Sequence, residues 1–359
     1  MRVMISAWVG AGNVGDELIL SAMLALLRRR DARVLVPSLQ PAETERIHRV
    51  TSVHHLDIHA ADRALQGCDL LIFGGGGLVQ DRSSPWSPYY QCLRLRLAAA
   101  HDVPVVALGI GAERLRRRGS LHMFASSLAA SCGIVARDPS SAAVLRDQLH
   151  LNVEVGADLA FTLCPPDRAP EERIVACLRD PGLDDGFVPA SMRREPRASR
   201  HPETLSLCLR DLADATGLPI RFVAMDRHRD LPLARAVAAR LGNAAEDIVV
   251  PSVHELLDTI AASRLAVTTR YHGGVAAALA GRPAVLLGYA PKLRALADQL
   301  PATTRLLPDM PAGYAQVRDT GVALLRDGVP GTRTDLDSQR EAARRNETML
   351  DTVIDGITG

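Results

Sequence analysis

The sequence predicts an α/β protein made of two doubly wound, Rossmann-like domains. Its 359 residues exceed the usual size of one hydrophobic core, and 47% of them are hydrophobic. Apolar runs of strand length alternate with amphipathic segments of helix length along the chain, which is typical of parallel βαβ units. A proline-rich break at 164–172, CPPDRAPEE, separates two series of such units.

The first series covers a predicted N-terminal domain, residues 1–165. Short apolar runs mark its strands, and the longer amphipathic segments between them mark its helices. We expect strands near 2–7, 33–36, 69–73, 104–108, 133–136 and 152–155, and helices over 16–30, 41–50, 88–101, 119–131 and 139–149.

The second series covers a predicted C-terminal domain, residues 172–359. It starts with a strand at 173–179, and a polar insertion at 181–203 follows that we expect to be a mobile loop. Two domains of this kind facing a cleft form the GT-B-like arrangement of many glycosyltransferases. Further strands are predicted near 221–225, 247–250, 264–268 and 284–287, and a long charged helix at about 335–355.

Composition excludes several classes of protein. A net charge of +1 leaves no strongly basic domain, so binding to nucleic acid is not expected. The six cysteines are scattered and form no CxxC pair, which argues against structural zinc or a disulfide framework and fits a reducing cytosol. The first residues resemble no signal peptide, and no window reaches the roughly 18 to 20 apolar residues of a membrane span. We expect a cytoplasmic protein without a metal site.

The first glycine-rich cluster, VGAGNVGDE at 9–17, has the spacing of a dinucleotide-binding turn. Such a site needs an acidic residue at the end of the second strand for the ribose, and VLVPSLQ offers none. Asp16 would also repel a pyrophosphate. A tight turn without a ligand is one alternative, and we favour a turn that faces the substrate, with hydrogen bonds from Asn13 and Asp16.

The second cluster, DLLIFGGGGLVQD at 69–81, is a buried strand that runs into four glycines. Without side chains at Gly75 and Gly76, a ligand or another backbone segment can approach closely. Such loops at the carboxyl ends of parallel strands are where ligands bind in open α/β sheets. Gln80 and Asp81 follow and could bind sugar hydroxyls, or could cap the next segment.

The third cluster, at 267–292, places cations at neighbouring strand ends. Arg270 and His272 follow one predicted strand, and Lys292, the chain's single lysine, follows the next. Together with a helix N-terminus they would form a pocket for a small anion of high charge. The alternative is a structural His272 and a surface Arg270.

One further arginine and one run of arginines are candidate binding residues. Arg137 ends a predicted strand of the N-terminal domain and could reach the cleft from that side. The run RLRRR at 114–118 is either a solvated face or a contact with phospholipid or a lipid diphosphate.

Taken together and in order, these stretches resemble the polysaccharide pyruvyl transferase family. The matching pieces cover both halves of the chain and leave out the insertion and the last helix. They are GNVGDELIL (12–20), DLLIFGGGGLVQD (69–81), PYY (88–90), VARDPSS (135–141), VACLRD (175–180), TTRYHGG (268–274) and GYAPK (288–292).

The resemblance implies transfer of the enolpyruvyl unit of phosphoenolpyruvate to two hydroxyls of a sugar, which gives a pyruvate ketal and phosphate. It implies a GT-B-like fold and no cofactor, with phosphoenolpyruvate as co-substrate. It also implies that Arg137, Arg270 and His272 act at phosphoenolpyruvate. The acceptor would belong to a cell-wall or exopolysaccharide precursor, by default a lipid-linked oligosaccharide at the inner face of the membrane.

Physical chemistry agrees with these roles. Phosphoenolpyruvate carries close to three negative charges, so several cations must converge on it. We expect His272 to be the acid and base, because histidine titrates near neutrality. Lys292 would hold the donor with the arginines, and Arg179 and Asp16 would lie on the acceptor side.

Three other functions stay open. A glycosyltransferase using a nucleotide sugar would share the fold. A non-catalytic glycan-binding or anion-binding relative would keep the fold and lack turnover. An oxidoreductase comes last, because the acid for the ribose is missing.

Overall fold

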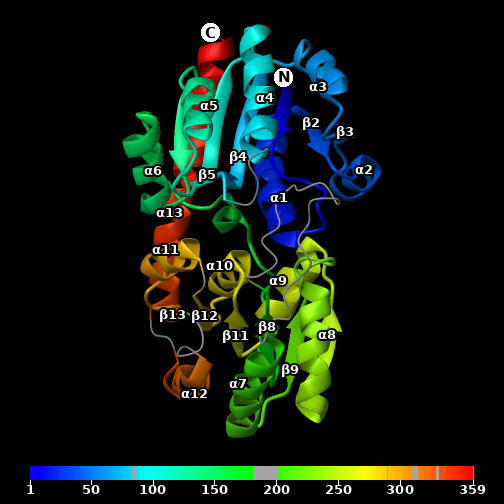
Figure 1. Ribbon diagram of the computed structural model, residues 1–359, viewed down its shortest axis with the longest axis vertical. Helices are drawn as coiled ribbons and strands as arrows, with labels where there is room; N and C mark the ends of the chain where they lie inside the picture. Colours follow the sequence, from blue (N-terminus) through cyan, green and yellow to red (C-terminus); the bar gives the residue numbers. More distant parts are fainter. Residues whose placement is uncertain (83–85, 181–200, 289, 309–313, 329–330, 359) are drawn as a thin grey trace.

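The computed structural model describes residues 1–82, 86–180, 201–288, 290–308, 314–328 and 331–358, which form two lobes (Figure 1). Each lobe is built on one parallel sheet. The first sheet has seven strands in the order β3-β2-β1-β4-β5-β6-β7, and the second has six in the order β10-β9-β8-β11-β12-β13. Each sheet is wound in both directions from its centre, so the predicted α/β class with two doubly wound sheets is confirmed.

The first sheet follows the predicted order of elements. Its strands are β1 (Arg2–Ser6), β2 (Arg33–Ser38), β3 (Thr51–His54), β4 (Leu70–Val79), β5 (Val105–Ala112), β6 (Gly133–Ala136) and β7 (Glu154–Val155). The helices are α1 (Val14–Arg28), α2 (Pro41–His48), α3 (Ile58–Leu65), α4 (Ser87–Ala100), α5 (Arg118–Leu128) and α6 (Pro139–Leu149), and the short 3-10 helix η1 (Leu159–Thr162) follows β7.

The second sheet repeats the pattern. Its strands are β8 (Ile174–Cys177), β9 (Ile220–Val223), β10 (Ala245–Val249), β11 (Leu265–Thr268), β12 (Ala284–Leu287) and β13 (Thr304–Leu307). The helices are α7 (His201–Thr216), α8 (Asp230–Leu241), α9 (Val253–Ala261), α10 (Tyr271–Leu279), α11 (Pro291–Gln299), α12 (Val317–Asp327) and α13 (Thr332–Thr358), with 3-10 turns η4 (Gly242–Ala244) and η5 (Tyr314–Gln316).

Helices on both faces bury the central strands completely. Every residue of β8, β11 and β12 is buried, which is why these strands read as continuous apolar runs. The chain reverses its direction of winding between β1 and β4 and between β8 and β11. Ligands of open α/β sheets bind at such switch points, beyond the carboxyl ends of the strands.

The last helix, α13, runs from the second lobe to the first (Figure 1). Near its start, the Asp335 carboxylate accepts the amide protons of Ala302 and Thr303, next to β13. Near its end, Leu350 and Val353 pack in one cluster with Val3 and Ile5 of β1. This helix therefore ties the two lobes together, although it follows the C-terminal lobe in the sequence.

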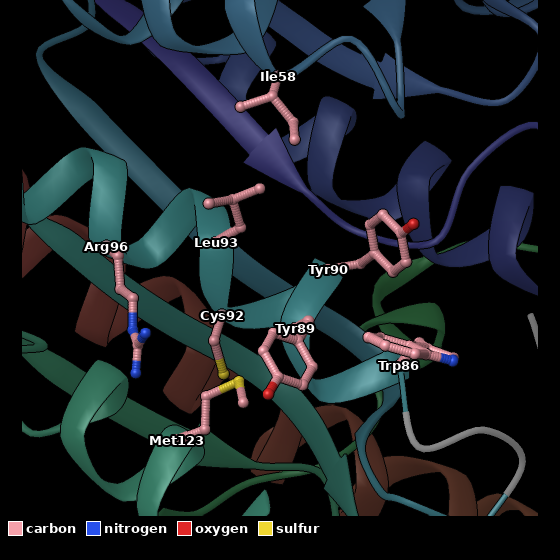
Figure 2. A pocket seen from close by; sticks show the side chains of 8 residues that line it. All are labelled: Ile58, Trp86, Tyr89, Tyr90, Cys92, Leu93, Arg96 and Met123. Atoms are coloured by element: carbon pink, nitrogen blue, oxygen red, sulfur yellow. The ribbon is translucent and has the colours of Figure 1, made fainter.

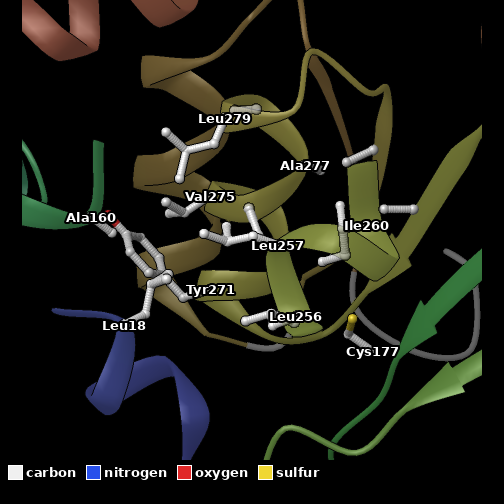
Figure 3. Close-up of a cluster of buried hydrophobic side chains, with 14 of the residues drawn as sticks. Leu18, Ala160, Cys177, Leu256, Leu257, Ile260, Tyr271, Val275, Ala277 and Leu279 are labelled. Carbon is white, nitrogen blue, oxygen red and sulfur yellow. The ribbon is translucent and has the colours of Figure 1, made fainter. Parts of the chain in front are cut away.

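The lobes also share a hydrophobic core. Leu18 of α1 and Ala160 of η1 pack in one cluster with Tyr271 and Val275 of α10 and Leu256 of α9 (Figure 3). The Val14 amide donates to the Met225 carbonyl, 2.8 Å away, so the start of α1 is also hydrogen-bonded to the second lobe. The residues around α1 and α10 thus have a fixed relation to one another.

Some elements differ from the sequence-based expectation. β3, α3 and β13 were not predicted, because β3 is mostly exposed and all three are short. Most of the expected insertion, residues 181–200, lies outside the described residues, and 201–203 begin α7. Among the helices of the described chain, none is both long and apolar enough to cross a membrane.

Candidate functional site

Residues of both lobes meet where the carboxyl ends of the two sheets face each other. The first lobe contributes the turn before α1, the end of β6 and the residue before η1. The second lobe contributes the ends of β8, β11 and β12. An isolated bridge between Asn13 and Asp226 joins the two sets.

His272 lies in the first turn of α10 and is buried between the lobes. Its Nε2 atom lies 3.5 Å from Oδ2 of Asp158, the residue just before η1. On its other side the ring packs against Gly15 of α1, where an added Cβ would lie 2.4 Å from Nδ1. The third glycine of the 9–17 cluster therefore leaves room for an imidazole of the opposite lobe, and not for a pyrophosphate.

Two carboxylates beside His272 have pKa values shifted in opposite directions. Burial raises the pKa of Asp158, but the contact with His272 and the charges of His272 and Arg137 outweigh it, so the pKa lies below its usual value. Burial raises the pKa of Asp16 above its usual value, against the effects of His272 and Asn13. Asp158 is thus a fixed anion, while Asp16 is the carboxylate that takes up a proton more readily.

Asn13 organises the turn that carries Asp16. Its Oδ1 accepts the Gly15 amide proton at 3.2 Å and caps α1, and its Nδ2 donates to Asp16 Oδ2 at 2.7 Å. Both side chains predicted to meet a substrate therefore hydrogen-bond each other. The other carboxylate oxygen of Asp16, Oδ1, faces Gly76 of β4, where an added Cβ would lie 3.7 Å from it.

Arg137 reaches the second lobe from the end of β6. Its guanidinium lies over the Tyr271 ring, 4.4 Å from the centroid, and its Nε donates to Asp138 Oδ2 at 3.2 Å. Because Tyr271 precedes His272, Arg137 of the first lobe and His272 of the second lobe, which were predicted to act together, lie close to each other. Gly111 makes this possible, because a Cβ there would lie 2.6 Å from the guanidinium carbon.

Lys292 lies among three arginines at the start of α11. Burial and the positive charges of Arg179, Arg137 and Arg270, partly offset by Glu113, lower the pKa of Lys292 to about 8. Within the described chain, Lys292 pairs with no carboxylate. Cations from the ends of β6, β8, β11 and β12 therefore converge, and an anion bound among them would relieve the repulsion at Lys292.

Arg270 is already paired with a carboxylate of its own lobe. Its Nε and Nη2 atoms donate to both oxygens of Asp230, at 2.8 and 2.5 Å, in a buried bidentate pair. Asp230 begins α8, so the pair fastens the end of β11 to that helix. The net charge of this pair is close to zero, and Arg137 likewise contacts Asp138 at 3.2 Å, whereas Lys292 has no carboxylate partner within the described chain.

The glycine-rich strand β4 lies close to α1. An added Cβ at Gly75 would come within 2.2 Å of the Ile19 side chain, so this glycine lets the helix approach the strand. Gln80 accepts the Arg82 amide proton at 2.9 Å. Asp81 is fully buried and accepts the amide protons of Arg116 and Arg117, at 3.1 and 2.8 Å, so its carboxylate orders the 114–118 segment.

The sequence-based prediction missed Asp158, Tyr271 and Asp230 as parts of this site. Asp158 follows a two-residue strand that carries almost no periodic signal, and Asp230 follows β9 after a polar turn. Tyr271 lies between Arg270 and His272, and this position is the only feature of the sequence that indicates a place in the site. All six cysteines are free, and the described residues include no group of His, Cys, Asp and Glu arranged to hold a metal ion.

Solved structures with a similar fold cover nearly the whole chain. The UDP-N-acetylglucosamine 2-epimerase of Rickettsia bellii is 11% identical, with a TM-score of 0.65, covering 100% of this chain and 97% of that one. The UDP-GlcNAc 2-epimerase of Methanocaldococcus jannaschii is 9% identical, with a TM-score of 0.66 and coverage of 98% and 100%. Anabaena HepE, solved with UDP-glucose, is 13% identical, with a TM-score of 0.62 and coverage of 99% and 100%.

At such low identity these similarities establish the fold alone, and they confirm the predicted GT-B-like arrangement. A search of curated proteins finds no match. The model of the polysaccharide pyruvyl transferase family matches residues 13–291, from the cap of α1 to the first residue of α11. The match covers most of the chain and both lobes, and it includes Arg137, Arg270 and His272. The chain belongs to the polysaccharide pyruvyl transferase family.

Proposed function

We propose that the protein transfers the pyruvyl group of phosphoenolpyruvate onto two hydroxyls of a sugar, forming a pyruvate ketal and releasing phosphate. Family membership supports this reaction class. The observation that carries the proposal is the convergence of Arg137, Arg179 and Lys292 from both lobes beside His272. This arrangement matches the charge of phosphoenolpyruvate.

The donor binds among these cations. Phosphoenolpyruvate has a carboxylate and a phosphate, and arginine forks suit both planar and tetrahedral oxyanions. Lys292 adds a compact charge that neutralises one oxygen. Burial, together with repulsion by the neighbouring arginines, lowers its pKa to about 8, and an anion among them would raise that pKa again. Arg270, held by Asp230, keeps the strand end and His272 in place and adds its field to the group.

The reaction moves two protons. One sugar hydroxyl adds to C2 of phosphoenolpyruvate as the methylene carbon takes a proton, and the carbon–oxygen bond to phosphate breaks. The second hydroxyl then adds to C2 and closes the ketal. One hydroxyl proton ends on the new methyl group, and the other leaves with the phosphate.

His272 and Asp16 are placed to carry these protons. His272 delivers a proton to the methylene carbon and is kept in orientation by Asp158. Asp16, whose pKa burial raises, accepts a proton from an acceptor hydroxyl. The acceptor lies on the side of the first lobe, near Asn13, Gly76 and Gln80. It is a precursor of a cell-wall or exopolysaccharide, carried on a lipid at the cytoplasmic face of the membrane.

A nucleotide-sugar glycosyltransferase is the second candidate. It is favoured by one observation, the fold shared with proteins solved with UDP or UDP-glucose. A non-catalytic anion-binding relative would keep the cations and lack turnover.

Ligand-induced stabilisation separates these functions. Phosphoenolpyruvate at about a hundredfold excess over its Kd should stabilise the fold by about 2.7 kcal/mol, whereas UDP and GDP should not. Lys292→Arg should weaken the effect of phosphoenolpyruvate, because a guanidinium does not replace a compact ammonium in a crowded site. Stabilisation by UDP or GDP without any by phosphoenolpyruvate would favour the glycosyltransferase. Stabilisation by phosphoenolpyruvate without phosphate release on any acceptor would favour the non-catalytic relative.

A further inference from the structure

An apolar groove lies on the outer face of the first lobe, between α4 and α5 (Figure 2). Ile58 of α3, Leu93 of α4 and Met123 of α5 line it, with Trp86 and Tyr89 at its rim. Trp86, Tyr89 and Ile58 are 52%, 56% and 42% exposed, and they are among the few large apolar side chains of the described chain that face solvent. Exposed apolar and aromatic side chains gathered around a groove are typical of surfaces that bind a protein, a membrane or a ligand.

Arginines are the most numerous charged residues around this groove. Two segments at the groove, residue 82 with residues 86–101 and residues 114–132, contain no Asp or Glu. Arg96 lines the groove itself, and the other exposed arginines of the two segments are Arg82, Arg114, Arg116, Arg117 and Arg118.

Nearby acids do not neutralise most of these arginines. Glu113 pairs with Arg82 at 3.2 Å, and the buried Asp81 carboxylate is taken up by main-chain amides and lies 3.8 Å from Arg117. On α3, Asp57 caps the helix and Asp62 contacts His101. Within the described chain, no carboxylate pairs with Arg96, Arg114, Arg116 or Arg118. By contrast, exposed arginines of the second lobe, such as Arg318 and Arg326, pair with aspartates.

We propose that this aromatic groove and the arginines beside it form the face by which the protein docks on an anionic lipid membrane. Tryptophan and tyrosine rings settle at the level of lipid headgroups, and arginines bind lipid phosphates. The combination favours a lipid surface, which presents phosphates and apolar groups together over a broad area. The arginine segments follow β4 and β5, so docking brings the membrane beside the carboxyl ends of the first sheet.

The fluorescence of Trp86 can report on binding to vesicles. The chain has two tryptophans, so a Trp8→Phe variant leaves Trp86 as the sole tryptophan, whose emission can be excited apart from that of the tyrosines. Full-length Trp8→Phe protein is mixed with vesicles of phosphatidylcholine alone or with phosphatidylglycerol added. We expect co-sedimentation with the anionic vesicles only, weakened by salt, together with a blue shift of Trp86 emission.

Two sets of variants separate the contributions. Replacing Arg114, Arg116 and Arg118 with Gln should lower vesicle partitioning about tenfold or more. Trp86→Ala with Tyr89→Ala should weaken binding at unchanged charge. A control on the second lobe, Arg318→Gln and Arg326→Gln with Leu207→Ala at a residue that is 63% exposed, should bind as the parent protein does, because these residues lie away from the groove.

Three results would overturn the proposal: no binding to anionic vesicles, binding that the groove variants leave unchanged, or binding without a change in Trp86 emission. Vesicle binding needs neither donor nor acceptor. Its failure would therefore leave the proposed pyruvyl transfer untouched.

Discussion

Replacing Gly15 with alanine should disable His272 without unfolding the protein. The added Cβ would lie 2.4 Å from Nδ1, 3.0 Å from Cγ and 3.1 Å from Cβ of His272. Ordinary contacts between such atoms are about 3.5 Å, so the imidazole must retreat by about 1 Å. It cannot do so freely, because Asp158 lies on its far side and the Tyr271 ring meets it edge to face.

The expected loss follows from that displacement. Moving a reacting group by about 1 Å costs on the order of a hundredfold in rate. Gly15 is the second residue of α1, where alanine improves helix propensity by up to about 1 kcal/mol and partly offsets the crowding. We therefore expect kcat to fall about a hundredfold, with little change in the KM for phosphoenolpyruvate and in the melting temperature.

The assay is phosphate release at saturating phosphoenolpyruvate and acceptor, beside a thermal unfolding curve. Gly119→Ala is the matched control, because Gly119 is the second residue of α5 and an added Cβ there would meet nothing within 4 Å. If Gly15→Ala kept a kcat close to that of Gly119→Ala, the assignment of proton transfer to His272 would be refuted.

Three further substitutions test other parts of the account. Lys292→Met should abolish use of phosphoenolpyruvate yet stabilise the fold at pH 7. Because folding lowers the pKa of Lys292 from 10.5 to about 8, its charge destabilises the folded state by up to about 3 kcal/mol, less for its partial exposure, below pH 8 and by nothing above pH 10.5. The variant should therefore melt at a higher temperature than the parent at pH 7 but not above pH 10.5, and equal melting temperatures at pH 7 would contradict this. Asp158→Asn should lower kcat by about a hundredfold with little change in KM, since it orients His272 without touching the donor, whereas a rise in KM alone would speak for a binding role. Asp81→Asn should destabilise the fold by about 1 to 3 kcal/mol, because the carboxylate accepts main-chain amide protons, and should leave kcat on a soluble acceptor unchanged. An unchanged melting temperature with a reduced kcat would instead indicate that Asp81 binds the acceptor.

Most strands and helices could be predicted from the periodicity of apolar residues in the sequence. β1, β6, β12 and α6 were predicted within a residue, because buried parallel strands and a proline-led helix leave clear local signals. The polar edge strand β3 and the two-turn helix α3 after it leave no such signal.

Several residues of the candidate site could be named from the sequence because they follow the ends of predicted strands. Arg270 and His272 follow β11 and Lys292 follows the neighbouring β12, so the approach of these three residues follows from topology. Pairwise contacts across the lobes could not be predicted, because they depend on how two sheets face each other. Asp158 beside His272, Arg137 over Tyr271 and the fit of Gly15 against the imidazole are of this kind.

We propose that this protein moves a pyruvyl group from phosphoenolpyruvate to a sugar diol. The most direct test uses phosphoenolpyruvate labelled with carbon-13 at C2, offered with a panel of free and lipid-linked saccharides and followed by NMR. His254→Ala, on an exposed histidine at the start of α9, is the control for His272→Ala. With His254→Ala, but not with His272→Ala, we expect a ketal carbon signal to replace the vinyl carbon signal as phosphate appears. An unchanged vinyl signal with every acceptor, together with no thermal stabilisation by phosphoenolpyruvate, would contradict it.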